Sequence, residues 1–67
     1  MLRVTINGED RELPDGITLS ALVHQLAFAS DRLAIERNRE VVRRADWPET
    51  VLADNDRVEI IHFVGGG

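Results

Sequence analysis

The chain carries RVEIIHFVGGG at residues 57–67, and this stretch decides the fold. Its first eight residues alternate between the two faces of a strand, which predicts a half-buried β-strand over 57–64. The inward residues are Val58 and Ile60, and the outward residues are Glu59, Ile61 and Phe63. Three glycines follow. Glycine adds no side chain to the packing, and it loses more conformational entropy on folding than other residues. We therefore expect a folded domain over 1–64 and a flexible glycine tail over 65–67.

The beginning of the chain shows the same alternation. Residues 2–6, LRVTI, predict a second half-buried strand. Asn7-Gly8 follows and is a strong hairpin-turn signal, because both residues tolerate a positive φ. Residues 10–13 can return as the partner strand. Since the first and last strands are both strongly apolar, we expect them to form the central pair of the sheet and to run parallel.

A single main helix is predicted after the first hairpin. Thr18 is a good N-cap, and Ile17 before it can pack against Leu22 as a hydrophobic staple. Helical spacing extends over about residues 19–28. The apolar stripe of this helix consists of Leu19, Leu22, Val23 and Leu26.

The remaining segments complete an α+β domain. Residues 33–37 and 40–43 read as two strands joined by a turn at Asn38-Arg39. In the connection that follows, we expect Trp47 to be packed and Pro48 to start a helical turn. The order strand, strand, helix, strand, strand, strand predicts a ubiquitin-like β-grasp: a mixed sheet of about five strands with one main helix packed across one face.

Composition excludes several classes of function. With 67 residues the chain forms one domain, and without cysteine it has no disulfide, thiolate metal site or cysteine nucleophile. A net charge of -4 argues against nucleic acid as the main partner. No apolar run approaches the roughly 20 residues that cross a bilayer, and no signal peptide is evident. We expect a soluble cytoplasmic protein that acts without a membrane.

No catalytic constellation is visible in the sequence. His24 and His62 lack metal-ligand spacing, we expect no metal, and no glycine loop suits a phosphate. The glycine tail is then the best candidate, with a frayed end of no function as the alternative. The segment 64–67 can reach roughly 13 to 14 Å when extended. It can therefore place the carboxylate of Gly67 in a narrow cleft of a partner. Once activated by ATP to an acyl-adenylate, that carboxylate yields a thiocarboxylate with sulfide or an isopeptide with an amine.

The whole chain resembles the ThiS family, the sulfur carriers of thiamine biosynthesis. The resemblance rests on Val4-Thr5-Ile6-Asn7-Gly8, Thr18-Leu19 with Leu22, Leu33-Ala34-Ile35-Glu36-Arg37-Asn38, Glu40-Val41-Val42, Arg44, Trp47, residues 54–60, and His62-Phe63-Val64-Gly65-Gly66-Gly67. Two positions depart from the family pattern. Arg43 stands where proline is frequent, and Asn55 stands where glycine is frequent. Asparagine tolerates the left-handed conformation, so we expect the turn at Asn55 to be kept.

The resemblance implies a sulfur carrier that is not itself an enzyme. A ubiquitin-activating-like enzyme would adenylate Gly67 with ATP, and the chain itself would bind no cofactor. A sulfur donor such as a cysteine desulfurase system would then form the thiocarboxylate, which thiazole synthase would consume. Gly67 is the modified residue, and Gly65 and Gly66 guide it. Ile61, Phe63 and Val64 are the candidate docking residues, with ordinary packing as their alternative role.

Three other functions remain open from the residues. The small subunit of molybdopterin synthase would share the fold, the tail and the thiocarboxylate chemistry. A ubiquitin-like protein modifier would join the tail to lysines. A simple binding domain would carry an inert tail.

Overall fold

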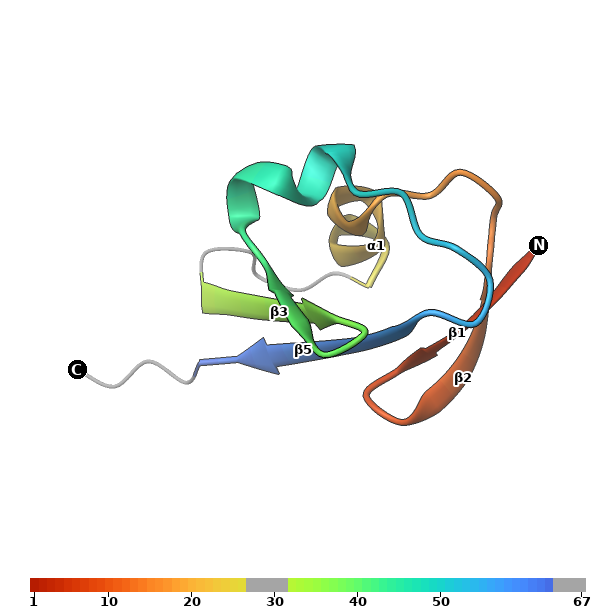
Figure 1. Cartoon of the computed structure of the whole chain (residues 1–67), viewed down its shortest axis with the longest axis horizontal. Helices are drawn as coiled ribbons and strands as arrows, with labels where there is room; N and C mark the ends of the chain where they lie inside the picture. Colours follow the sequence, from red (N-terminus) through yellow and green to blue (C-terminus); the bar gives the residue numbers. More distant parts are fainter. Residues whose placement is uncertain (27–31, 64–67) are drawn as a thin grey trace.

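The computed structural model describes residues 1–26 and 32–63, in which one helix lies across one face of a mixed sheet (Figure 1). The elements in chain order are β1 (Leu2–Ile6), β2 (Glu9–Leu13), α1 (Leu19–Gln25), β3 (Leu33–Arg37), β4 (Glu40–Val42), the 3-10 helix η2 (Arg44–Glu49) and β5 (Arg57–His62). These elements confirm the predicted β-grasp. The predicted boundary between a domain at 1–64 and a tail at 65–67 lies outside the described residues.

The first and last strands are adjacent and parallel, as predicted. The strand order is β2-β1-β5-β3-β4, with the register Ile6↔Val58 between β1 and β5. The other pairs are antiparallel. β5 is therefore the middle strand, and both its edges face other strands.

The core lies between the sheet and the helical layer formed by α1 and η2. Alternate residues of the strands and the apolar stripe of α1 fill it, as their periodicities require. The buried hydrophobic residues are Val4, Ile6, Leu13, Ile17, Leu19, Leu22, Val23, Leu33, Ile35, Trp47, Leu52, Val58 and Ile60. Trp47 also donates from Nε1 to the carbonyl of Val42 at 3.0 Å, so its one polar atom is satisfied.

The helix begins where the sequence predicts. The Thr18 hydroxyl accepts a hydrogen bond from the Ala21 N–H at 3.1 Å, and Ile17 and Leu22 are both part of the core. α1 ends at Gln25, earlier than the predicted end near residue 28. Leu26 is the C-cap, and its N–H still donates to the carbonyl of Leu22 at 3.0 Å. Residues 27 and 28 lie outside the described part.

The other boundaries differ by small shifts with local causes. β2 begins at Glu9, one residue earlier than predicted, because the two-residue turn at Asn7-Gly8 leaves Glu9 opposite Ile6. β4 ends at Val42, and Arg43 is the N-cap of η2. The predicted helical start at Pro48 is wrong, since η2 begins at Arg44 and contains Pro48.

Turns with a positive φ shape the hairpins. Asn7 and Gly8 have φ values of 51° and 84°, as the predicted hairpin requires. Asn55 has a φ of 70°, which confirms that asparagine keeps the left-handed turn expected there. Its N–H donates to the carbonyl of Arg3 at 2.7 Å and ties the 54–56 turn to β1.

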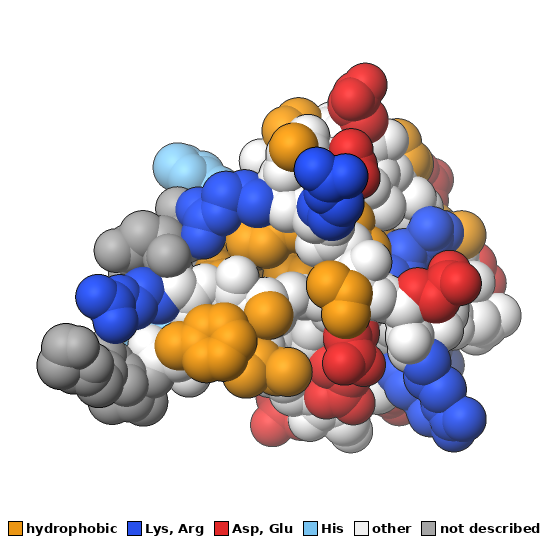
Figure 2. Space-filling view, turned by 60° about the vertical axis from the view of Figure 1, so that its left-hand side comes forward, with side chains coloured by type: hydrophobic (Ala, Val, Ile, Leu, Met, Phe, Trp, Pro, Cys, Tyr) orange, Lys and Arg blue, Asp and Glu red, His pale blue; other side chains and the backbone are white. Residues whose placement is uncertain are grey.

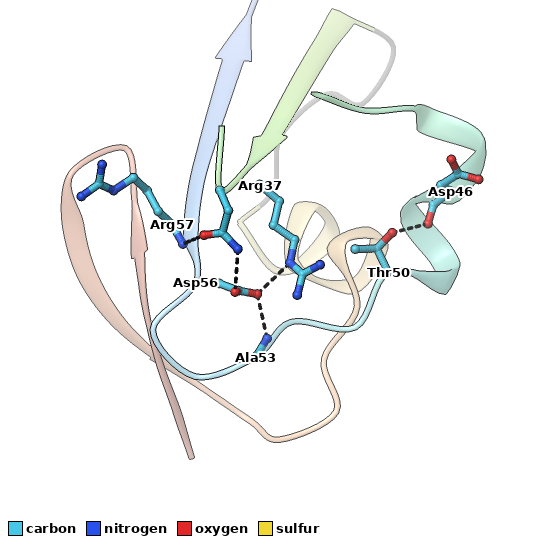
Figure 3. Close-up of polar contacts among 7 residues, drawn as sticks. Arg37, Asp46, Thr50, Ala53, Asp56 and Arg57 are labelled. Carbon is cyan, nitrogen blue, oxygen red and sulfur yellow. Dashed lines mark hydrogen bonds and ion pairs between the residues drawn. The ribbon is translucent and has the colours of Figure 1, made fainter. Parts of the chain in front are cut away.

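A buried carboxylate joins this turn to the β3–β4 hairpin (Figure 3). Asp56 is 6% exposed and accepts hydrogen bonds from the Ala53 N–H, the Asn38 amide and the Arg37 guanidinium at 2.8, 3.0 and 2.8 Å. Burial by itself raises the pKa of Asp56. The three hydrogen bonds and the charge of Arg37 outweigh that effect and hold the pKa below its ordinary value. The Asn38 side chain also accepts from the Arg57 N–H at 2.9 Å, so it connects the hairpin to β5.

We expect Asp56→Asn to lower the free energy of unfolding at pH 7 by about 2 to 3 kcal/mol, because it removes the charged acceptor that Arg37 and Ala53 share. A carboxyl with a lowered pKa in the folded state stabilises the protein above its ordinary pKa of about 4. That contribution is lost as the pH falls through the lower folded-state pKa. Urea unfolding at several pH values should therefore show the deficit of the variant shrinking below about pH 4.

Asp46→Asn is the matched control, since the Asp46 side chain is exposed and only its backbone carbonyl accepts a hydrogen bond, from Thr50. It should change the stability by less than about 0.5 kcal/mol. A deficit of Asp56→Asn that stays constant down to pH 3 would contradict a role for the charge.

Candidate functional site

The predicted site begins at the end of the central strand. β5 ends at His62, two residues before the predicted end of the strand, and Phe63 follows it directly. The Phe63 N–H donates to the carbonyl of Arg32 at 2.9 Å, so the chain stays attached on the β3 side up to this point. Val64 and the glycines 65–67 lie outside the described residues, and the roles predicted for them stay predictions.

The β1 side of the central strand is held by a side chain. β1 ends at Ile6, but the amide of Asn7 continues the pairing. Its Oδ1 accepts from the Ile60 N–H at 2.7 Å, and its Nδ2 donates to the Ile60 carbonyl at 3.2 Å. Asn7 therefore acts as one extra peptide unit of β1. The sequence indicated Asn7 only as a turn residue, because the register that brings it to Ile60 is a long-range feature.

The predicted docking residues Ile61 and Phe63 lie on the outer face, the sheet face opposite α1. Their exposed fractions are 46% and 55%, whereas their neighbour Ile60 is buried in the core. Ala34 on β3 lies directly opposite Ile61. We call Ala34, Ile61 and Phe63 the apolar patch. Figure 2 shows hydrophobic side chains gathered on this side of the molecule.

Two glutamates lie beside the apolar patch on the same face. Glu36 on β3 is directly opposite Glu59 on β5. We call these two residues the acidic pair. The sequence indicated that Glu59 faces outward, but not that Glu36 is its neighbour, because nothing local fixes the register between β3 and β5.

A groove elsewhere on the molecule involves none of the predicted site residues. It lies between α1 and η2 and has a volume of about 850 Å³, with Ser20, His24, Gln25 and Trp47 among its lining residues. The Arg44 guanidinium lies 5.0 Å from the centre of the Trp47 ring, a cation–π contact that fixes one wall. The groove is on the helical side of the sheet, and the apolar patch is on the opposite side.

Neither histidine forms part of a metal centre in the part of the chain described. His24 and His62 are both exposed. Among residues 1–26 and 32–63, no three His, Cys, Asp or Glu side chains are grouped so that they could hold a metal ion. None of the helices in these two ranges is long and apolar enough to cross a membrane.

Known proteins resemble this chain over nearly its whole length. The profile of the ThiS family matches residues 4–67. A thiazole synthase of Magnetococcus marinus is 39% identical over 66 residues, which are 98% of this chain and 20% of that protein. The chain thus spans about a fifth of the thiazole synthases that it matches. The sulfur carrier protein ThiS of Bacillus subtilis is 35% identical over 63 residues, which cover 92% of this chain and 96% of that protein.

A solved structure shares the fold. The crystal structure of the thiamine biosynthesis protein ThiS from Geobacter metallireducens superimposes with a TM-score of 0.84 at 29% identity, covering 98% of this chain and all of that one. The family match, the similarity to a sulfur carrier of nearly the same length and the common fold agree with one another. The chain therefore belongs to the ThiS family, the sulfur carrier proteins of thiamine biosynthesis.

Proposed function

We propose that this carrier works through the carboxylate of Gly67, which is converted to a thiocarboxylate and gives its sulfur to the thiazole ring of thiamine. The observation that carries the proposal is the family match, which runs through the last glycine at residue 67. The chain has no cysteine, so it offers no thiol on which sulfur could travel. Sulfur bound to the carboxyl carbon at the chain end can be carried without any thiol of the protein.

The proposed chemistry needs two steps before transfer. A separate enzyme joins a carboxylate oxygen of Gly67 to the α-phosphorus of ATP and releases pyrophosphate. Sulfide, which a thiol reductant releases from the persulfide of a donor such as a cysteine desulfurase system as the thiol is oxidised to a disulfide, then attacks the acyl carbon. The C–S bond forms and AMP leaves with the electron pair of the C–O bond. In this scheme the carrier binds no cofactor of its own and is a co-substrate of other enzymes in the cytoplasm.

Thiazole synthase is the proposed acceptor of the sulfur. Two relatives named thiazole synthase contain a region 39% and 36% identical to this chain, over 98% of its length in each case. In those proteins the matching region and the rest of the thiazole synthase belong to one polypeptide. This supports a working partnership between the matching region and thiazole synthase.

The outer face supplies a docking surface next to the chain end. Ile61 and Phe63 are the last outward-facing residues described before the tail, and both expose large apolar side chains. A partner that takes the tail into a cleft would cover them, and Val64 is proposed to extend the same contact. Burial of such side chains favours association by roughly 25 cal/mol per Å² of apolar surface.

The first test is the mass of the carrier after incubation with the adenylating enzyme, ATP and a sulfide source. We expect the mass to rise by the difference between sulfur and oxygen, because one terminal oxygen is replaced. A variant with one alanine added after Gly67 is the control and should keep its mass, since its chain end no longer fits the adenylating site. An unchanged mass of the natural chain, or an isopeptide adduct with lysines of other proteins, would contradict the proposal.

The second test concerns the apolar patch. We expect Ile61→Thr to slow the transfer of sulfur from the thiocarboxylate form of the carrier to thiazole synthase at low carrier concentration by about tenfold, the effect of losing about 1.4 kcal/mol of contact. Its free energy of unfolding should stay within about 0.5 kcal/mol of the natural chain, because Ile61 lies outside the core. Reaction rates and urea unfolding measure the two effects.

Val51→Thr is the matched control, since Val51 is also an exposed apolar residue but lies outside the apolar patch. It should leave the rate unchanged. Equal rates for Ile61→Thr and the natural chain would remove Ile61 from the docking surface.

A further inference from the structure

The acidic pair places two like charges side by side. Glu36 and Glu59 are directly opposite each other in the antiparallel β3–β5 pair, and their strand neighbours Ile35 and Ile60 point into the core. Both glutamates therefore project from the outer face. Glu59 is exposed, and Glu36 is half-buried. Like charges at directly opposed positions destabilise a sheet by up to roughly 1 kcal/mol.

Within residues 1–26 and 32–63, neither glutamate of this pair forms an ion pair. The ion pairs of that part of the chain are Met1–Asp15, Arg11–Glu9 and Arg37–Asp56. Arg37 follows Glu36 directly but is used by Asp56 in the interior. Arg57 shares a face with Glu59, but it lines a separate small pocket with Asn38, Arg39 and Asn55 and forms no ion pair with Glu59. The acidic pair therefore has no ion-pair partner among the described residues.

Apolar side chains lie on two sides of the acidic pair, toward the end of β5 and across on β4. Successive outward residues of β5 are about 7 Å apart, so Glu59 lies about 7 Å from Ile61 and about 14 Å from Phe63 along the strand. Across the sheet, Val41 on β4 is directly opposite Glu36 and is 71% exposed. A partner covering the apolar patch would also cover the acidic pair and remove water from it. Two unpaired carboxylates would make that contact costly.

We propose that the acidic pair receives one arginine from the surface of thiazole synthase that covers the apolar patch. The inference rests on the proposed function and adds the chemistry of the docking surface. A guanidinium carries five N–H donors in a planar fork, so it can bind both carboxylates at once. It would supply the ion-pair partner that neither glutamate has among the described residues. It would also fix the position of the carrier along its partner. A shift by one outward residue of β5 would place the arginine opposite Ile61.

The test compares the affinities of two double variants for thiazole synthase. Glu36→Gln with Glu59→Gln removes the acidic pair and keeps its shape. We expect its dissociation constant to rise tenfold or more, because the partner arginine would be buried without a counter-charge. We also expect the affinity to depend less on salt. Its urea unfolding midpoint should be equal to that of the natural chain or higher, because the repulsion is gone.

Glu12→Gln with Glu49→Gln is the control, which removes the same charge from exposed positions on β2 and η2. Its dissociation constant should change less than twofold. Should the two double variants bind equally well, the acidic pair would have no role, while a thiocarboxylate on the natural chain would still support the proposed function.

The adenylating enzyme provides a second arm of the experiment. If Glu36→Gln with Glu59→Gln lost affinity for the adenylating enzyme alone, the acidic pair would contact that enzyme and not thiazole synthase. This result would overturn the proposal. A natural chain that binds thiazole synthase in neither its carboxylate nor its thiocarboxylate form would overturn the acidic-pair contact together with the proposed acceptor.

Discussion

β1 and β5 lie side by side and run in the same direction, and a parallel pair cannot be closed by a tight turn. The chain between them has to leave the sheet and return. It does so through β2, which pairs with β1, through α1 and η2, which lie over one face of the sheet, and through β3 and β4, which extend the sheet beyond β5 (Figure 1). This pairing places the last strand in the middle, where its inward residues Val58 and Ile60 are buried. The residues after β5 therefore come directly after the middle strand of the sheet, which pairs with a strand on each side.

Hydrogen bonds of polar side chains add stability that the small hydrophobic core does not supply alone. A domain of this size buries only about 60% of the surface of its unfolded chain, so each well-made polar contact matters. Asp56 collects three donors and joins the turn before β5 to the β3–β4 hairpin. Asn7 pairs with both backbone groups of Ile60 and extends β1 by one unit. Both contacts fix β5 along its length, so the outward residues Glu59 and Ile61 are presented in a defined arrangement.

The two faces of the sheet have different tasks because β-strand side chains alternate. The inward face stabilises the domain through packing against α1. The outer face contributes little to the core, and its exposed apolar and acidic side chains are free to serve recognition. In the proposed mechanism the domain performs no chemistry on its own. In that mechanism the partner would recognise the outer face, and the chain end would enter the site of the partner.

The sequence by itself determined the elements and their faces. Alternation over 2–6 and 57–62, the Asn7-Gly8 turn and the Thr18 cap are local signals, and each is found in the structure, with the last strand two residues shorter than predicted. The burial of Ile60 and the exposure of Ile61 followed from the same periodicity. The resemblance to the ThiS family, carried by short segments along the chain, also came from sequence. Only the tertiary structure decided which residues from distant segments meet. The opposition of Glu36 and Glu59, the contacts of Asn7 with Ile60 and the donors around Asp56 depend on strand register and on turn geometry across the fold. The side-chain period of a strand says which way a residue points, but the residue opposite it is set by packing of the whole sheet against α1.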